Sequence, residues 1–286
     1  MNSTTRRRGI ATVAFAMLLL AACASTTRPT AEATSQNPQS AALDAILAGE
    51  HRSAEHRARD QYRHPKETLL FFGLQPDMHV AEIWPGANGW YSEIIAPLVA
   101  GKGKYYAVHW EANPDSKFIT EGIQAYTAKL TQAPAVYGDV TLTALGPKSL
   151  TIAPPGSLDM VLTFRNIHNW MARDFQTAAV QAMYDALKPG GILGVVEHRG
   201  NAAVRQDPTA KNGYVNEDYA IQLFRSAGFE LLAKSEINAN PRDTKDYEQG
   251  VWTLPPTYRL GPTDRDKYAA IGESDRFTLK FRKPLR

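Results

Sequence analysis

Two short segments of the chain hold side chains that could do chemistry. The first, RNIHNW at 165–170, places Arg165, Asn166 and His168 directly after the apolar run LDMVLTF. The second is the end of the apolar run GILGVVEH, where His198 stands. An imidazole titrates near physiological pH, so each histidine is a candidate general base. Each also fits an ordinary role in stabilising a loop.

A third segment, EIWPGANGW at 82–90, joins an apolar run to a helical pattern. Gly86 and Gly89 permit backbone conformations that a Cβ disfavours and let a ligand approach the main chain. Asn88 tolerates a left-handed conformation better than most residues. The helix expected next offers unpaired amides to an anionic group. We therefore expect this turn to hold a nucleotide-like ligand, with Trp84 narrowing one wall.

Short apolar runs alternate with helical patterns along most of the chain. Strands are expected at 79–84, 104–110, 134–140, 158–164, 191–198, 229–237 and 276–283, and helices at 90–99, 116–130, 173–187 and 216–228. The alternation predicts an α/β fold, a Rossmann-like and mostly parallel seven-stranded sheet with helices on both faces. The last two strands lack a helix of comparable length between them, which predicts an antiparallel edge hairpin.

The segment 43–74 precedes the first of these strands and is rich in charge. It predicts two helices that are separated at His64-Pro65, because a residue before proline avoids the helical region.

The order of elements and several strings resemble the class I S-adenosylmethionine-dependent methyltransferases over residues 65–286. The strings are HVAEIWPGANGW, VYGDV, GSLDMVLTFRNIHNW and ALKPGGILGVVEHR, of which LKPGG is the most specific piece. The resemblance implies S-adenosylmethionine as cofactor and methyl transfer as the reaction. Ligands of such sheets bind beyond the carboxyl ends of the strands, where each of these strings places its loop.

The resemblance also implies which residues contact the cofactor. Glu82 stands where family members bind the methionyl amine, and Glu111 or His109 stands where an acid takes the ribose hydroxyls. Asp139 resembles the residue that accepts from the adenine amino group. Alternatively, Glu111 is an exposed loop acid and Asp139 a turn or helix cap. The implied cofactor contacts are Glu82, Trp84, Gly86, Asn88, Gly89, His109, Glu111, Asp139, Val140 and Arg165.

The turn at 82–90 departs from the family pattern, because Trp84 and Pro85 stand where the first glycine is usual. On the acceptor side, Asn166 resembles the residue that faces the methyl group, and the candidate catalytic residues are Asn166, His168 and His198. Candidates for a lid or acceptor contact are Arg59, Tyr62, Arg63 and Tyr214. The alternative for the first three is a solvated helix face. No paired-cysteine or His-Glu-x-x-His motif occurs, so we expect no metal.

The first residues of the chain have the pattern of an export signal. Arg6, Arg7 and Arg8 precede the apolar run GIATVAFAMLLLAAC. Its last four residues resemble the lipobox of bacterial lipoproteins, in which the cysteine becomes the lipidated first residue; Cys23 is the only cysteine. The alternative is an ordinary signal peptide that is cleaved nearby. We expect a signal peptide at 1–22, a flexible tether at 23–42 and the methyltransferase-like domain at 43–286.

Removal of residues 1–22 takes the formal charge from +3 to zero, which disfavours nucleic acid as a partner. We expect a bacterial envelope protein, anchored by lipid at the outer membrane and facing the periplasm. One hypothesis is a methyltransferase of a small molecule or an envelope component. The other is a non-catalytic binding module for a nucleoside-like or other envelope ligand. The altered glycine turn and His109 favour the module, whereas LKPGG and the polar loop at 165–170 favour the enzyme.

Overall fold

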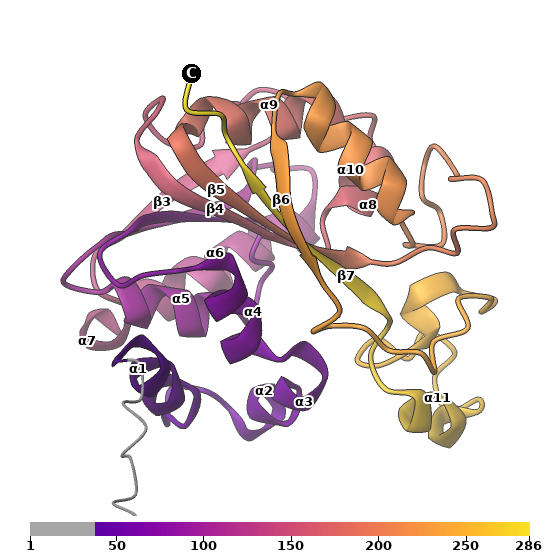
Figure 1. Cartoon of the computed structure of the whole chain (residues 1–286). Helices are drawn as coiled ribbons and strands as arrows, with labels where there is room; N and C mark the ends of the chain where they lie inside the picture. The colour runs from indigo at the N-terminus through magenta and orange to yellow at the C-terminus, as the bar shows by residue number, and fades with distance from the viewer. Residues whose placement is uncertain (1–37) are drawn as a thin grey trace, which may run out of the picture. The chain divides into compact units, whose positions relative to one another are not determined.

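The computed structural model describes residues 38–286, so the predicted signal peptide and Cys23 lie outside the described residues. Within them, seven strands form one sheet in the order β3-β2-β1-β4-β5-β7-β6 (Figure 1). The strands are β1 His79–Ile83, β2 Lys104–Trp110, β3 Val140–Leu145, β4 Leu158–Phe164, β5 Leu187–His198, β6 Glu230–Ser235 and β7 Arg276–Arg282.

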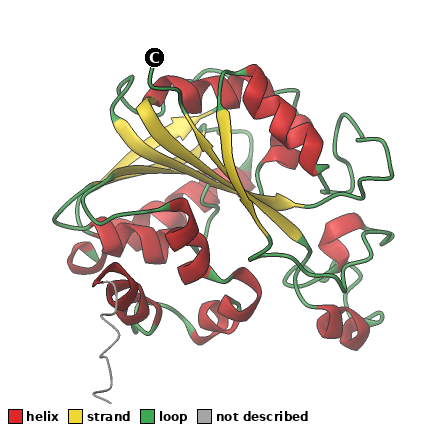
Figure 2. Ribbon diagram, viewed as in Figure 1, coloured by secondary structure: helices red, strands yellow, loops and turns green. Residues whose placement is uncertain are grey.

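Helices lie on both faces of this sheet (Figure 2). In chain order they are α1 Pro38–Leu47, α2 Ala54–Ala58, α3 Asp60–Arg63, α4 Pro65–Phe72, α5 Ser92–Val99, α6 Lys117–Thr131, α7 Pro134–Tyr137, α8 Ile167–Met171, α9 Gln176–Ala186, α10 Glu217–Ser226, the short 3₁₀ helix η1 Gly250–Thr253 and α11 Arg265–Ile271. Helices α1 and α4 to α7 cover one face, and α8 to α10 cover the other (Figure 1). Among the described residues, no helix is both long and apolar enough to cross a membrane.

The pairing of the strands confirms the predicted fold class. Strand β1 runs parallel to β2 and β4, and β3 and β5 extend the parallel part on either side. Strand β7 runs antiparallel to β5 and β6 and lies between them. The strand order reverses at β1 and β4, so the carboxyl ends of these two strands diverge into loops on opposite faces of the sheet. Ligands of open α/β sheets bind at this switch point.

Two apolar cores, one on each face, hold the helices against the sheet. Trp170 of α8 and Phe224 of α10 pack on one face, while Phe72 of α4 and Tyr126 of α6 pack on the other, and all four are fully buried. Burial of one such side chain stabilises the fold by about 1.5–3 kcal/mol. The two cores therefore fix the strand ends from which the site is built.

The third strand differs from the prediction, which placed it at 134–140. Residues 134–137 form the single turn of α7, because Pro134 suits the first position of a helix and Gly138, at φ 68°, ends it. Strand β3 begins at Val140, where threonines alternate with apolar residues. The prediction was therefore wrong by about one strand length.

The helical segment before β1 also differs from the prediction. Four helices, α1 to α4, replace the two that were expected, because the chain turns after α1 and Ser53 caps α2 through a hydrogen bond from His56 N. The break at His64-Pro65 is present: His64 is left-handed at φ 39° and α4 begins at Pro65. Helix α1 includes residues 38–42, which were expected in the tether, and it buries Gln39.

Candidate functional site

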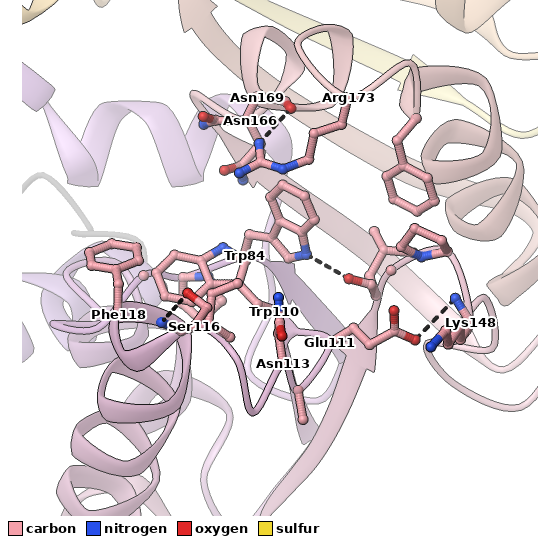
Figure 3. A pocket seen from close by; sticks show the side chains of 18 of the residues that line it. Trp84, Trp110, Glu111, Asn113, Ser116, Phe118, Lys148, Asn166, Asn169 and Arg173 are labelled. Carbon is pink, nitrogen blue, oxygen red and sulfur yellow. Dashed lines mark hydrogen bonds between the residues drawn. The ribbon is translucent and has the colours of Figure 1, made fainter.

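A cavity of about 900 Å³ lies at the carboxyl ends of β1 to β4. Its walls are the turn after β1, the loop 111–116 after β2, residues 145–148 after β3 and residues from the segment 164–175 around α8 (Figure 3). This is the edge where the strand order switches, and four consecutive strands of the sheet contribute to it. The cavity is large enough for a ligand of drug or cofactor size.

The turn after β1 keeps the cavity open by its backbone conformation. Gly86 has φ 74°, and a Cβ placed on it would meet no atom within 4 Å, so this residue faces open space. Gly89, at φ 55°, serves packing instead, because a Cβ there would lie 2.6 Å from the ring of Tyr126. Asn88 does not line the cavity. Asn88 does not adopt the left-handed conformation that was expected of it; in this turn the non-glycine residue with that conformation is Trp84, with φ 47°.

The Trp84 indole forms one wall of the cavity without filling it. Its Nε1 donates a hydrogen bond to the Leu145 carbonyl at 3.0 Å, and the ring stacks on Phe175 (Figure 3). A non-glycine residue in this conformation costs on the order of 1–3 kcal/mol. The hydrogen bond and the contacts with Phe175 and Trp170 offset that strain. An indole thus replaces the glycine of the family pattern and braces the end of β1 against the end of β3.

The end of β2 separates the two candidates for ribose binding. Glu111 lines the cavity, and its Oε1 accepts a hydrogen bond from Lys148 N at 3.0 Å (Figure 3). His109 is 4% exposed and does not line the cavity. Burial lowers the pKa of His109 to about 4, against a weaker opposing effect of the Gly86 backbone, so the ring is neutral. Only Glu111 can meet a ligand here.

Glu82 lies beneath the turn, inside the core, and does not line the cavity. Its Oε2 accepts hydrogen bonds from Tyr105 Oη at 2.6 Å and Ser92 Oγ at 2.8 Å. Burial raises the pKa of Glu82 to about 7, although these two hydroxyls oppose the shift. The carboxyl group therefore joins β1, β2 and α5, and it does not face the cavity as the resemblance implied.

Asp139 and Val140 lie at the wrong end of β3 for the role implied by the resemblance. Val140 begins the strand and pairs with Tyr105 near the amino end of β2. Asp139 lines a separate, smaller cavity of about 280 Å³ with Lys104 and His79, which also stand at amino ends. The assignment of Asp139 to the adenine amino group therefore fails, because the third strand was predicted too early in the chain. The residues at the end of β3 and after it that line the cavity are 145–148.

The loop after β4 brings Arg165 and Asn166 to the cavity. Arg165 is left-handed at φ 61°. The residues that directly follow β1 and β4, Trp84 and Arg165, are therefore both strained non-glycine residues that line the cavity. Asn166 Nδ2 donates to the Ile83 carbonyl at 2.7 Å and to Thr163 Oγ1 at 3.2 Å, which ties β1 to β4. Its Oδ1 has no hydrogen-bond partner among the described residues.

His168 and His198 meet each other but do not line the cavity. Their ring centroids are 5.4 Å apart, His168 Nδ1 is 3.1 Å from Glu197 Oε1, and His198 Nδ1 is 2.6 Å from Ser274 Oγ. Burial, then the neighbouring His168 and the arginines beyond it, lower the pKa of His198 well below its ordinary value. A base role for either ring stays a prediction.

His168, Glu197 and His198 also have ligand atoms within 4.8 Å of one another, a grouping that could hold a metal ion. The Glu197 carboxylate, however, already accepts from Ile167 N at 2.6 Å and His198 N at 2.8 Å as well as contacting His168. These backbone donors explain why the carboxylate is buried: it fixes the loop after β4 to the end of β5.

The residues expected in a lid do not line the cavity. Arg59 and Arg63 contact Glu273 instead, and Arg63 is 2% exposed, which excludes the alternative of a solvated face for it. The ring of Tyr62 lies against Gly272. Tyr214 is also buried, and its hydroxyl donates to Asp243 Oδ1 at 2.9 Å.

Several cavity residues were not singled out from the sequence. Trp110 and Phe118 place their rings 5.3 Å apart at the cavity, and Phe118 is 72% exposed. Arg173 lies over the Trp84 ring and donates to the Asn169 carbonyl at 2.8 Å (Figure 3). The available signal was the segments that follow the parallel strands, which hold the large exposed aromatic Phe118 in the first turn of α6.

Comparison of the sequence with protein-family models and with curated proteins finds no match. Solved structures do match. A SAM-dependent methyltransferase from Aquifex aeolicus superposes with a TM-score of 0.52 at 15% identity, covering 79% of this chain and 93% of that one. A SAM-dependent methyltransferase from Methanosarcina mazei gives 0.50 at 14%, with coverage of 76% and 98%. The [4+2]-cyclase SpnF gives 0.54 at 16%, with coverage of 84% and 86%.

These similarities define the fold class. The chain has the Rossmann-like fold of the class I SAM-dependent methyltransferases, as the sequence resemblance predicted. At 14–16% identity the similarity concerns the fold, and function must be argued from the site.

Proposed function

We propose that the protein is an exported, lipid-anchored methyltransferase that uses S-adenosylmethionine. The observation that carries this proposal is the cavity of about 900 Å³ at the switch point of a methyltransferase fold, with Glu111 at the end of β2 and open space beside Gly86. The acceptor is a small molecule or an envelope component.

The residues at the cavity fit the parts of this cofactor. Glu111 has one carboxylate oxygen that accepts no hydrogen bond among the described residues, which suits ribose hydroxyls. The rings of Trp110 and Phe118 offer flat apolar surface to an adenine. Arg173 supplies positive charge for the methionyl carboxylate. Bound S-adenosylmethionine would supply an electrophilic methyl group.

The protein's part in this reaction is to position the acceptor and to exclude water. Asn166 is the first candidate, because its amide nitrogen is held by β1 and β4 while its Oδ1 remains available to orient a donor group of the acceptor. His168 and His198 are buried and do not line the cavity. A movement of the loop after β4 would be needed before either ring accepts a proton from an acceptor.

A titration of the full chain with S-adenosylmethionine and S-adenosylhomocysteine tests the proposal. We expect micromolar binding. Glu111→Gln should weaken it about tenfold, the scale of one charged hydrogen bond. The matched control is Asp139→Asn, which also neutralises one acid after β2. Asp139 lies at the amino ends of the strands, away from the cavity. Absence of binding at millimolar ligand to the folded chain, or equal losses in both variants, would refute the assignment.

Binding alone does not distinguish an enzyme from a binding module, and the similarity to SpnF adds a reason to measure turnover, because that protein of the same fold is a cyclase. We expect candidate acceptors to cause formation of S-adenosylhomocysteine. Tight binding without turnover on any envelope extract would favour the binding module.

The location rests on the sequence before residue 38, which places Cys23 after an apolar run. We expect Cys23→Ser to release the protein from the membrane fraction and to abolish incorporation of labelled fatty acid. A variant that stays lipid-labelled would contradict lipid anchoring at this residue.

A further inference from the structure

Three arginines converge on one buried carboxylate beside the cavity. Glu273, just before β7, accepts from Arg59 Nε at 2.7 Å and from Arg63 Nε at 3.0 Å, and Arg276 binds its Oε2. Glu273 and Arg276 are 3% and 2% exposed. Although burial opposes it, Arg63, Arg276 and Arg59 hold the pKa of Glu273 well below its usual range, so this carboxylate is charged.

Arg165 adds a fourth guanidinium and connects the group to the cavity. It lines the cavity, and its guanidinium makes no hydrogen bond or ion pair among the described residues. Burial, together with the charges of Arg276 and Arg59, lowers the pKa of Arg165 to about 10, although Glu273 opposes the shift. We call Arg59, Arg63, Arg165 and Arg276 the arginine cluster.

The arginine cluster has more donors than partners. Nη2 of Arg59 and Nη1 of Arg63 are buried and have no hydrogen-bond acceptor in the described part of the chain. Arg63 is 2% exposed, and although it packs on the Trp90 ring at 4.6 Å, that contact satisfies no N–H group. Buried donors in native proteins nearly always have a partner, because leaving one unpaired is costly.

The other carboxylates nearby are already engaged. Asp275 pairs with Lys245 at 2.8 Å, Asp60 pairs with Arg52 at 2.7 Å, and Glu197 is held by backbone amides. Four guanidinium groups therefore share one available carboxylate, which leaves a surplus of three positive charges. Arg63 and Arg276 are buried, whereas Arg59 and Arg165 are half-buried. A purely structural ion pair would be expected to balance its charges, since uncompensated buried charge is strongly destabilising.

We propose that the arginine cluster binds an oxyanion, a carboxylate or phosphate group, of the methyl acceptor. The proposal rests on the proposed function for the role of acceptor. Arginine forks suit planar carboxylate and phosphate oxygens, and the unpaired Nη groups of Arg59 and Arg63 supply the free donors. Arg165 stands at the boundary between this group and the cofactor cavity, so an anion held there lies beside the expected methyl donor. The acceptor is thus an anionic molecule.

The test is a calorimetric titration of the full chain, in detergent and in phosphate-free buffer, with inorganic phosphate and with acetate. S-Adenosylhomocysteine is titrated in parallel. We expect saturable binding of at least one of the two anions. Arg59→Gln should weaken that binding about tenfold or more, because one charge-assisted hydrogen bond is lost.

The control is Arg282→Gln, which removes one positive charge from the other end of β7, where Arg282 pairs with exposed Glu230. It should change anion affinity less than about twofold, given the weakness and screening of exposed charges. Arg59→Lys keeps the charge but not the fork and should give an intermediate loss, which also serves if Arg59→Gln proves to be unfolded by circular dichroism.

The outcomes separate this proposal from the proposed function. Binding of S-adenosylhomocysteine without binding of either anion overturns the oxyanion site and leaves the cofactor assignment intact. Anion binding that is lost in Arg59→Gln, without binding of S-adenosylhomocysteine, supports the oxyanion site and refutes the methyltransferase. Equal anion affinity in Arg59→Gln and Arg282→Gln overturns the site.

Discussion

Glu82 and Glu273 are both almost fully buried, yet their surroundings hold them in opposite ways. Glu82, at the end of β1, is surrounded by hydroxyl groups of Ser92 and Tyr105, and burial raises its pKa to about 7. Glu273 is surrounded by guanidinium groups, which lower its pKa despite burial. One carboxyl group can keep its proton near neutral pH, whereas the other is a permanent anion.

The comparison shows that burial alone does not set the state of a carboxyl group. Hydroxyl donors reduce the cost of burying a charged carboxylate only in part, so burial still favours the protonated form of Glu82. Guanidinium groups outweigh the cost for Glu273 and in turn depend on it for compensation. The first carboxyl therefore belongs to the packing beneath the glycine turn, and the second organises the arginine cluster.

Removal of the Glu273 charge should have the largest effect. Glu273→Gln leaves the buried guanidinium groups of Arg63 and Arg276 without the carboxylate that they share, and we expect the free energy of unfolding to fall by about 3–5 kcal/mol. Urea denaturation at pH 7 measures this. Glu230→Gln is the matched control, because the Glu230–Arg282 pair is exposed and should be worth less than about 1 kcal/mol. Similar losses in the two variants would contradict the comparison.

The same charge predicts an acid-side dependence of stability. The pKa of Glu273 is lower in the folded chain than in the unfolded one, so the unfolded chain binds more protons as the pH falls below about 4.5. We expect the contribution of Glu273 to be complete above that pH and to be lost progressively below it. The difference in unfolding free energy between wild type and Glu273→Gln should therefore shrink between pH 4.5 and pH 3; a constant difference would be contrary to it.

Glu82 predicts the opposite slope at higher pH. Its pKa rises from 4.5 to about 7 on folding, so the folded chain binds more protons between these values and stability falls as the pH rises through them. The shift corresponds to a loss on the order of 3 kcal/mol. Glu82→Gln removes this loss, so we expect the variant to unfold like wild type at pH 5 and to be more stable at pH 8. A gap of equal size at both pH values in urea denaturation would rule this out.

The smallest effect is expected from one hydroxyl of the Glu82 surroundings. Ser92→Ala removes a donor to Glu82 Oε2 and should cost about 1 kcal/mol. Because that donor favours the charged carboxylate, its loss should raise the pKa of Glu82 in the folded chain, so the fall in stability should extend to a higher pH. The exposed Ser226→Ala, which also removes a hydroxyl donor, is the control. If Ser92→Ala leaves the pH profile in place, the hydroxyls do not set the state of Glu82.

The fold and part of the cavity could be predicted from the sequence because their signals are local. Alternating apolar runs predicted the sheet. The rule that ligands bind beyond strand ends, together with the family resemblance, located Gly86, Glu111, Arg165 and Asn166. The prediction of the third strand was wrong for a local reason as well. The apolar residues of PAVYGDV resemble a strand, but the proline and glycine that flank them close a helical turn.

The arginine cluster had no local signal. Arg59 and Glu273 are separated by 214 positions in the sequence, and only the pairing of β7 with β5 brings them together. Arg63 looked like part of a charged helix face, because a charge pattern cannot reveal a partner that lies so far along the chain. The left-handed conformation of Trp84 was hidden in the same way, since its compensation comes from Leu145 and Phe175.

The position of β7 in the sheet has a consequence for the order of folding. Strand β6 has β7 as its one neighbour in the sheet, so it joins the sheet only through β7, and β7 must in turn pair with β5. That insertion joins residues about eighty positions apart and thus carries a large loop-closure cost, which slows it. During synthesis, the parallel strands can emerge and begin to pair while Arg59, Arg63 and Arg165 still lack Glu273. Assembly of that charged region is therefore a late event, and a stalled or truncated chain would expose it to proteases.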